Sequence, residues 1–309
     1  MQKIRFSKMN GQGNDFIIID ATQKPLQEIN LKAGQIAKIC DRHFGIGADG
    51  LIIVRNSTEG ADFFMDYYNQ DGSVAEMCGN GIRCMAKFIL DKGLSENSAL
   101  KILTRAGLKN VEILKLNIQE QKNYNNYNEN SKNPVLIKVD MGSPVFEPSK
   151  IPVNIDKKDL LFGYFAGNYK LPVKNTDFAI SCVSMGNPHC VIFLDDGQPL
   201  EEIPIDNWGP EIEKNAIFPK KTNVEFIKVI DNCRLKMRVW ERGVGETLAC
   251  GTGACASAVC ATVLEKVYPP VINVNLPGGQ LKITWMGKNS NVFLEGTVEN
   301  VFEGEYLLA

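Results

Sequence analysis

Two segments of the sequence are apolar on nearly every side, and this feature constrains the fold more than any other. Residues 81–92 and 252–266 have the length of helices, with Gly93 following the first and Pro269-Pro270 following the second. A helix that is apolar all round must be buried on most of its surface. We therefore expect each helix to be wrapped by a β-sheet.

Both helices begin with the same pattern. The first is entered through MCGNGIRC at 77–84 and the second through ACGTGACA at 249–256. Each pattern places a cysteine, Cys78 or Cys250, directly before a Gly-x-Gly turn that runs into the helix. A shift of 172 or 173 residues also aligns Gly13-Asn14 with Gly186-Asn187, Gly50-Leu51 with Asn223-Val224, and Asn69 with Arg242. The chain therefore indicates an internal duplication.

The length of 309 residues favours two domains, in agreement with the duplication. The predicted fold class is α+β, with two pseudo-symmetric domains, each a mixed β-sheet around a central buried helix. Halves of this kind commonly face each other, so the active site is expected in the cleft between the domains. The Asn-rich run 119–133 lacks an apolar period and is predicted to be a solvated loop just before the domain boundary. Strands are predicted at 16–19, 51–54, 135–139, 191–194, 224–230 and 235–239, and weaker helices at 31–40 and 207–215.

The composition excludes several classes of partner. The net charge is −2 and the pI is near 5.9, which does not suit nucleic acid, so a small polar molecule is the expected partner. No apolar run reaches the roughly 18 residues that span a bilayer, and the first residues lack the apolar core of a signal peptide. Nine cysteines, an odd number, do not indicate a disulfide framework. We therefore expect free thiols, a cytoplasmic location and no membrane partner.

The two duplicated cysteines suit acid and base chemistry. A Gly-rich turn entering a helix offers backbone N–H groups and the positive end of the helix dipole, which bind anions and favour a thiolate. We expect this environment to lower a cysteine pKa from about 8.5 toward neutrality. With a carboxylate held between two such turns, one thiolate could remove the α-proton while the opposite thiol delivers another. Such a pair would share one proton in its working form and would invert the carbon.

The same residues also have alternative interpretations that involve no acid/base catalysis. A single free cysteine is more often packing than catalytic, and the duplication is what favours function at Cys78 and Cys250. Phosphate binding by the Gly-rich turns stays open as a minor alternative. No metal site is expected, because cysteines five residues apart on a helix are turned by about 140° from one another. The cysteines without the turn context are predicted to be structural: Cys40, Cys84, Cys182, Cys190, Cys233, Cys255 and Cys260.

Polar residues beside the duplicated patches also have two interpretations. His189 either faces the cleft or is a hydrogen-bonded core histidine. Glu241 and Arg242 could be a solvated pair, but their place in the repeat favours the cleft. Four asparagines could be plain turn residues or could together form an amide-lined pocket that recognises a second polar group. They are Asn14, Asn69, Asn187 and Asn223.

The motifs that contain these residues resemble those of the diaminopimelate epimerase family. The resemblance covers nearly the whole chain, and the motifs occur in order along it. They are G-x-G-N-D-F at 11–16, D-R-x-x-G-I-G-A-D-G at 41–50, N-x-D-G at 69–72, C-G-N-G-x-R-C at 78–84, G-N-P-H at 186–189, T-N-V-E-F at 222–226 and W-E-R-G-x-G-E-T-x-A-C-G-T-G at 240–253.

The resemblance implies an isomerase of lysine biosynthesis that interconverts LL- and meso-2,6-diaminopimelate without a cofactor, as a homodimer. By motif position, Cys78 resembles the proton donor and Cys250 the acceptor in the LL to meso direction, while His189 and Glu241 resemble residues that tune the catalytic site. The reacting carboxylate would be bound at Gly79, Asn80, Gly251 and Thr252. The distal L-amino-acid end would be bound by Asn14, Asn69, Asn187, Asn223, Glu241 and Arg242.

The resemblance also implies that the last strand, residues 300–308, crosses back to the first half. The expected domains are therefore 1–134 plus 298–309, and 135–297. Two departures from the family concern Gly50, where some members carry glutamine, and the long insert at 119–133. Three other functions fit the motifs less well. A proline racemase-like enzyme has no use for the distal-end residues, and an amino-acid binder needs no cysteines. Pyridoxal phosphate catalysis needs a lysine, which the duplicated motifs lack.

Overall fold

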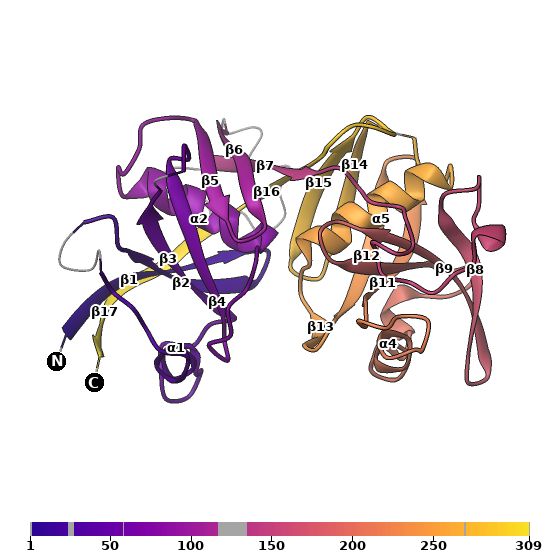
Figure 1. The fold of residues 1–309 in the computed structure, drawn as a ribbon, viewed down its shortest axis with the longest axis horizontal. Helices are drawn as coiled ribbons and strands as arrows, with labels where there is room; N and C mark the ends of the chain where they lie inside the picture. The colour runs from indigo at the N-terminus through magenta and orange to yellow at the C-terminus, as the bar shows by residue number, and fades with distance from the viewer. Residues whose placement is uncertain (1, 24–27, 58, 117–134, 269, 309) are drawn as a thin grey trace. The chain divides into compact units, whose positions relative to one another are not determined.

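The chain forms two compact units in the computed structural model, which describes residues 2–23, 28–57, 59–116, 135–268 and 270–308 (Figure 1). Unit 1 comprises Met1–Asp140 and Glu295–Ala309, and unit 2 comprises Met141–Leu294. The chain passes between the units in β7 (Val135–Gly142) and in β16 (Val292–Thr297). The boundaries expected after residue 134 and before residue 298 lie a few residues from these, and the Asn-rich run 119–133 lies outside the described residues.

Unit 1 is a mixed sheet around one central helix. Strand β2 pairs in parallel with β3 and antiparallel with β1, while β3 pairs antiparallel with β4. Helix α2 contacts strands β1, β2, β3 and β6, and residues 79–89 of it are buried. The elements are β1 (Gln2–Gly11), β2 (Asn14–Asp20), α1 (Ala33–Cys40), β3 (Gly50–Asn56), β4 (Phe63–Asn69), α2 (Gly79–Asp91), β5 (Ala99–Thr104), β6 (Gly107–Lys115) and β17 (Glu299–Leu308).

Unit 2 repeats this plan around α5. The helix is built almost wholly from Gly, Ala, Ser, Cys, Thr and Val, and it contacts β9, β10, β11, β12, β14 and β15. The α+β class, with a mixed sheet around a buried helix, is confirmed in both units. The elements are η1 (Lys157–Asp159), β8 (Ala166–Val173), β9 (Thr176–Ser184), β10 (Pro188–Phe193), η2 (Leu200–Glu202), α4 (Ile205–Glu213), β11 (Asn223–Asp231), β12 (Arg234–Glu241), β13 (Gly245–Thr247), α5 (Gly251–Val263), β14 (Val271–Leu276) and β15 (Gly279–Trp285).

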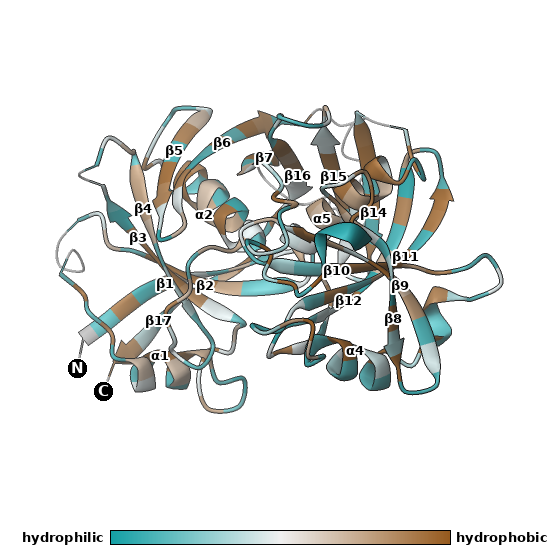
Figure 2. Ribbon diagram, turned by 45° about the vertical axis from the view of Figure 1, so that its right-hand side comes forward, coloured by the Kyte–Doolittle hydropathy of each residue, from teal (hydrophilic) through white to brown (hydrophobic). Residues whose placement is uncertain are grey.

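A second apolar layer in each unit fixes the peripheral helix to the sheet. In unit 1, Ile36 and Ile39 of α1 pack with Ile53 and other buried residues of β1, β2 and β3. In unit 2, Ile205 and Ile212 of α4 take part in the corresponding cluster with residues of β8 to β11. In Figure 2, brown apolar segments and teal polar segments alternate along several strands. This alternation is expected where one face of a strand is covered.

The strand registers establish the duplication at the level of single residues. Phe16 pairs with Gly50 in parallel strands of unit 1, and His189 pairs with Asn223 in unit 2, which places both pairs at an offset of 173. One hairpin later, Leu51 pairs with Tyr68 whereas Val224 pairs with Trp240. The offset therefore falls to 172 within this hairpin. Asn69 consequently corresponds to Glu241, and the alignment of Asn69 with Arg242 was wrong by one residue.

The final strand joins unit 1 as the resemblance implied. β17 pairs antiparallel with β1, from Lys3 opposite Leu307 to Asn10 opposite Glu299. Phe6 of β1 contacts Phe302 of β17 edge to face, with ring centroids 5.8 Å apart. Within the described ranges, no helix has both the length and the apolar character needed to cross a bilayer.

Two candidate half-sites

Cys78 caps the start of α2. Its backbone is extended (φ −139°, ψ 123°), and its sulfur accepts a hydrogen bond from the Gly81 N–H at 3.5 Å. A side chain on Gly81 would approach Ile52 Cδ1 and Met65 Cε at 3.1 Å, so glycine lets the helix start lie close to the sheet. Cys78 is partly exposed. The helix therefore presents a reachable sulfur beside its positive end.

A row of side-chain amides lies beside the Cys78 sulfur. Asn14 Oδ1 is 3.8 Å from Cys78 Sγ and accepts a hydrogen bond from Asn80 Nδ2 at 3.2 Å. Asn14 Nδ2 donates to Asp49 Oδ2 at 2.6 Å. The side-chain oxygen of Asn80, Oδ1, accepts from Arg83, which is fully buried, at 3.0 Å. The structure thus brings the predicted residues Asn14, Cys78 and Asn80 together.

Asn69 is placed by the turn that ends β4. Its N–H donates to the Ser73 carbonyl at 2.9 Å, and its side-chain nitrogen donates to Ser73 Oγ at 3.0 Å. Gly72 within this turn has a φ of 81°, and a Cβ there would lie 2.2 Å from the Ala33 carbonyl oxygen. Asn69 is therefore held by local turn bonds, as the alternative interpretation of the asparagines had it. Within the described residues, the Asn69 side chain bonds to Ser73 and not to Cys78.

Gly50, the departure from the family pattern, has no room for a side chain. A Cβ on Gly50 would lie 2.7 Å from both Tyr67 Cε2 and the Tyr68 carbonyl oxygen. The Tyr67 ring therefore occupies the space that a residue 50 side chain would enter. Tyr67 itself is buried and packs edge to face against Phe16.

Cys250 caps α5 with a similar extended backbone (φ −128°, ψ 110°) but lies in a different environment. The residue is only 5% exposed, and its sulfur lies 3.5 Å from Thr252 Oγ1. Burial raises the pKa of the Cys250 thiol well above its usual value, and the negative charges of Glu241 and Glu225 raise it further. The expectation that the helix start lowers this pKa was wrong, because burial and two carboxylates outweigh the dipole.

Glu241 stands beside Cys250 at the end of β12. Its carboxylate accepts from Thr247 Oγ1 at 2.5 Å and takes part in a hydrogen bond with the Cys250 thiol. Burial raises the pKa of Glu241, against the opposing effect of those two hydrogen bonds. A carboxylate and a thiol with raised pKa values and a shared hydrogen bond can exchange one proton.

His189 is the centre of a second hydrogen-bonded row and is fully buried. Its Nδ1 lies 2.7 Å from Glu225 Oε1, and its Nε2 lies 2.9 Å from Asn187 Oδ1. Asn187 Nδ2 donates to Thr252 Oγ1 at 3.3 Å, and Thr252 in turn contacts Cys250. The row links Glu225 to the Cys250 sulfur. His189 is thus a hydrogen-bonded buried histidine that is linked to Cys250 through Asn187 and Thr252.

Asn223 and Arg242 form the next layer of the second half-site. Asn223 Nδ2 donates to the Pro188 carbonyl at 3.0 Å, and Asn223 Oδ1 accepts from the Arg242 N–H at 2.8 Å. Asn223 is buried, and these two hydrogen bonds join two backbone segments. The Arg242 side chain is exposed, and its guanidinium donates to the Lys220 carbonyl at 3.2 Å.

Several residues of the half-sites were missed as individual residues although their motifs were recognised. Asp49 ends G-A-D, Arg83 stands in C-G-N-G-x-R-C, and Glu225 stands in T-N-V-E-F. Charged residues inside otherwise apolar strands or helices were the available signal, since buried charges require partners. Glu213 of α4 was also missed. It accepts from Trp240 Nε1 at 2.9 Å and from the Gly243 N–H at 3.0 Å, and so braces the Arg242 loop.

The described part of the chain holds no group of three or more His, Cys, Asp and Glu side chains that could bind a metal ion. The cysteines called structural are buried, except for Cys233, which is exposed. Cys233 lies in the hairpin between β11 and β12, where its N–H donates to Asp231 at 3.0 Å.

Comparisons with known proteins match nearly the whole chain. A family model described as diaminopimelate epimerase matches residues 6–147 and 181–301. A diaminopimelate epimerase of Halothermothrix orenii is 45% identical over 309 residues, covering 99% of both chains. That of Acetivibrio thermocellus is 43% identical over 302 residues, covering 98% of both.

Solved structures share the fold at much lower identity. A phenazine biosynthesis protein of the PhzF family from Bacillus anthracis matches with a TM-score of 0.67 and 17% identity, covering 100% of both chains. A hydroxyproline epimerase from Agrobacterium vitis matches with a TM-score of 0.64 and 10% identity, covering 99% of this chain and 91% of the other.

Proposed function

The chain belongs to the diaminopimelate epimerase family, a family of isomerases, and on this premise we propose that it interconverts LL- and meso-2,6-diaminopimelate in lysine biosynthesis in the cytoplasm. The proposed mechanism uses Cys78 and Cys250 as the two acid/base groups and no cofactor. The observation that carries the proposal is that both cysteines cap buried helices that begin with Gly-x-Gly. The family match spans both half-sites.

The chemistry requires an acid on one face of the α-carbon and a base on the other. In the LL to meso direction, Cys250 takes the α-proton as a thiolate, and Cys78 delivers a proton as a thiol. The N–H groups at Gly79, Asn80, Gly251 and Thr252 stabilise the carboxylate charge that grows as the proton leaves. Each such donor contributes about 3 kcal/mol in comparable anion sites.

The thiolate form of Cys250 needs help, since burial raises the pKa of this thiol. Glu241 supplies that help, because it shares a hydrogen bond with Cys250 and its own pKa is raised by burial. Moving the thiol proton to Glu241 removes one negative charge from the carboxylate as the thiolate forms. The Thr252 hydroxyl, 3.5 Å from the sulfur, then donates to the thiolate.

The distal amino-acid end of the substrate is assigned to the outer residues of the half-sites. Arg242 is exposed and carries the positive charge that a second carboxylate requires. Asn14, Asn69, Asn187, Asn223 and Glu241 complete the proposed set. Asn187 and Asn223 act in part by holding Thr252 and the Arg242 backbone.

The decisive experiment is incubation with LL-diaminopimelate in heavy water. The meso product should carry deuterium at the inverted carbon, while LL substrate recovered at early conversion should carry almost none, because the two faces use different acid/base groups. Proline serves as a control monocarboxylate that should neither invert nor take up label. Deuterium appearing equally in recovered substrate and product would contradict the two-base mechanism.

Cysteine variants test the assignment of the two groups. Cys78→Ala and Cys250→Ala should each lower inversion by at least about a thousandfold, since general acid–base catalysis contributes on that order. Cys84→Ala and Cys255→Ala are matched controls, because both cysteines are buried in the same helices away from the caps. Inversion retained in either cap variant would refute the assignment.

A further inference from the structure

The orientation of the Asn14 side chain carries an inference about Cys78. An asparagine amide can present either its oxygen or its nitrogen to a neighbour, and the choice determines whether the neighbour meets an acceptor or a donor. Asn14 lies at 3.8 Å from Cys78 Sγ through its oxygen. The contacts that fix the orientation of the Asn14 amide therefore influence the protonation of the Cys78 sulfur.

Both ends of the amide row are chemically fixed. At one end, the guanidinium of Arg83 can only donate, and it donates to Asn80 Oδ1 at 3.0 Å. At the other end, the carboxylate of Asp49 accepts from Asn14 Nδ2 at 2.6 Å. Asn80 Nδ2 then donates to Asn14 Oδ1 at 3.2 Å between them. A flip of either amide would place two donors or two acceptors against each other.

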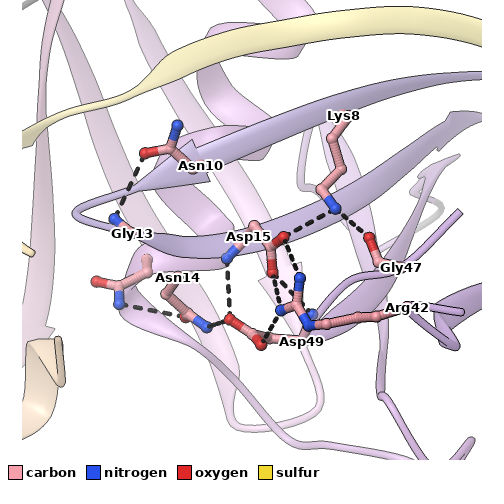
Figure 3. Close-up of polar contacts among 9 residues, drawn as sticks. Lys8, Asn10, Gly13, Asn14, Asp15, Arg42, Gly47 and Asp49 are labelled. Atoms are coloured by element: carbon pink, nitrogen blue, oxygen red, sulfur yellow. Dashed lines mark hydrogen bonds and ion pairs between the residues drawn. The ribbon is translucent and has the colours of Figure 1, made fainter. Parts of the chain in front are cut away.

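Asp49 is itself held as a charged acceptor. Arg42 forms an ion pair with Asp49 at 2.7 Å and with Asp15 at 2.8 Å, and Lys8 pairs with Asp15 at 2.8 Å. The Asp15 N–H also donates to Asp49 Oδ2 at 3.1 Å. Figure 3 shows this cluster around the turn between β1 and β2, with Asn14 extending from it to Asp49. The cluster anchors the acceptor that orients Asn14.

We propose that Asp49 is a positioning residue that turns the Asn14 carbonyl oxygen toward Cys78 and so favours the protonated thiol at this position. The oxygen can accept a hydrogen bond from S–H, whereas it would repel a thiolate. This inference deepens the acid role proposed for Cys78 and rests on it for its catalytic meaning. The titration of the Cys78 thiol is measured without turnover. This inference can therefore be refuted or supported independently of the proposed function.

In the second half-site, the hydrogen bonds run in the opposite direction, so that a donor rather than an acceptor lies next to the cysteine. Asn187 turns its oxygen to His189 Nε2 and its nitrogen to Thr252 Oγ1, so its row ends with a hydroxyl that can donate to Cys250. The position equivalent to Asp49 is Thr222, whose hydroxyl donates to the Asn223 carbonyl. Among the described residues, a carboxylate therefore orients an amide oxygen toward the cysteine in the first half-site and not in the second.

Other charges around Cys78 must be separated from this effect. The charged side chains of the hydrogen-bonded network that reaches Cys78 are Lys8 and Asp15 from β1 and β2, Arg42 and Asp49 from the segment between α1 and β3, and Arg83 from α2 itself. Asp49→Asn removes a negative charge and leaves one acceptor oxygen for the three donors that the carboxylate serves, which are Arg42, the Asp15 N–H and Asn14 Nδ2. Asp15→Asn removes the same charge from the same cluster without removing a bond to the Asn14 side chain.

The test follows the rate of iodoacetamide alkylation at Cys78 by peptide mass spectrometry, over roughly pH 6 to pH 10, where thiols titrate. Asp49→Asn should lower the midpoint of the pH profile and raise the alkylation rate near pH 7 by about fivefold, as loss of one hydrogen-bond preference implies. Asp15→Asn should change that rate by less than about twofold. Equal changes in the two variants, or a slower reaction in Asp49→Asn, would overturn the proposal.

A second variant makes the test independent of how well Asp49→Asn folds. Asn14→Ala removes the carbonyl itself and should raise the alkylation rate by a similar factor. Adding Asp49→Asn to Asn14→Ala should then have no more effect than adding Asp15→Asn. An unchanged rate in Asn14→Ala would also overturn the proposal, and circular dichroism confirms that each variant is folded.

Discussion

The Cys250 thiol is subject to opposing influences within a few ångströms. The start of α5 and the Thr252 hydroxyl favour the thiolate, whereas burial and the charges of Glu241 and Glu225 favour the thiol. Burial and the carboxylates win, so the thiol pKa is raised. The proton can leave only when a neighbour takes it, which is why Glu241 is central to the proposed mechanism.

Glu241→Gln separates these influences. Removing the carboxylate should lower the pKa of the Cys250 thiol and raise its alkylation rate near neutral pH on the order of three- to tenfold. Inversion should nevertheless fall, because the thiol has lost its proton acceptor. Glu246→Gln is a matched control, since Glu246 is exposed in the same hairpin and pairs with Arg238 at 2.7 Å. Faster inversion in Glu241→Gln would contradict this account.

Asp15 makes the stability of the protein depend on pH in the acid range. Burial raises its pKa, but hydrogen bonds and charges from Arg42 and Lys8 outweigh burial and lower the pKa from 3.8 to about 2. Because the folded pKa is depressed, the stabilisation is present above pH 4 or so and is lost as pH falls toward about 2. Urea unfolding of Asp15→Asn should therefore show a loss of about 2 kcal/mol near pH 7 that shrinks below about pH 4. A constant difference at all pH values would argue against the linkage.

At the scale of elements, the two capped helices differ in what their third-residue glycines face. A Cβ on Gly253 would lie 2.8 Å from Glu225 Oε1, the oxygen that holds His189. A Cβ on Gly81 would lie 3.1 Å from the flexible ends of Ile52 and Met65. A buried carboxylate thus excludes a side chain at Gly253 of α5, whereas at Gly81 of α2 only the packing of apolar side chains opposes one.

Substituting both glycines by alanine tests this difference. Alanine favours a helix over glycine by about 1 kcal/mol, so Gly81→Ala should be close to neutral once the neighbours shift. Gly253→Ala should instead destabilise unit 2 by about 1–3 kcal/mol, because the Glu225 carboxylate is hydrogen-bonded and cannot move cheaply. Thermal and urea unfolding of the two variants measures both values. Equal destabilisation would show that the carboxylate is not the deciding contact.

At the scale of the whole molecule, the chain ends determine the integrity of unit 1. β17 is the last strand in the sequence, yet it pairs along β1, and Tyr306 and Leu308 pack against the core cluster that contains Ile4 and Phe6. Deleting residues 299–309 should therefore speed amide hydrogen exchange in β1 and β2 while leaving β11 and β12 nearly unchanged. A uniform increase in both units would contradict this division.

The homodimer implied by the family resemblance stays a prediction that sedimentation velocity can test.

Local patterns in the sequence were sufficient to predict the two buried helices and some of the strands. Helix α2 was expected from 81 and begins at Gly79, and α5 was expected from 252 and begins at Gly251, because apolar periodicity and caps act within a few residues. The strands at 16–19 and 51–54 lie within β2 and β3 for the same reason.

Tertiary structure decided the chemistry around those cysteines. The sequence placed Cys78 and Cys250 in the same motif, but only the fold made the first partly exposed beside an amide oxygen and the second buried beside Glu241. It also closed the space at Gly50 with the ring of Tyr67. Burial, charge and hydrogen-bond direction depend on which strands lie next to a helix start, and residues far apart in the sequence supply those neighbours.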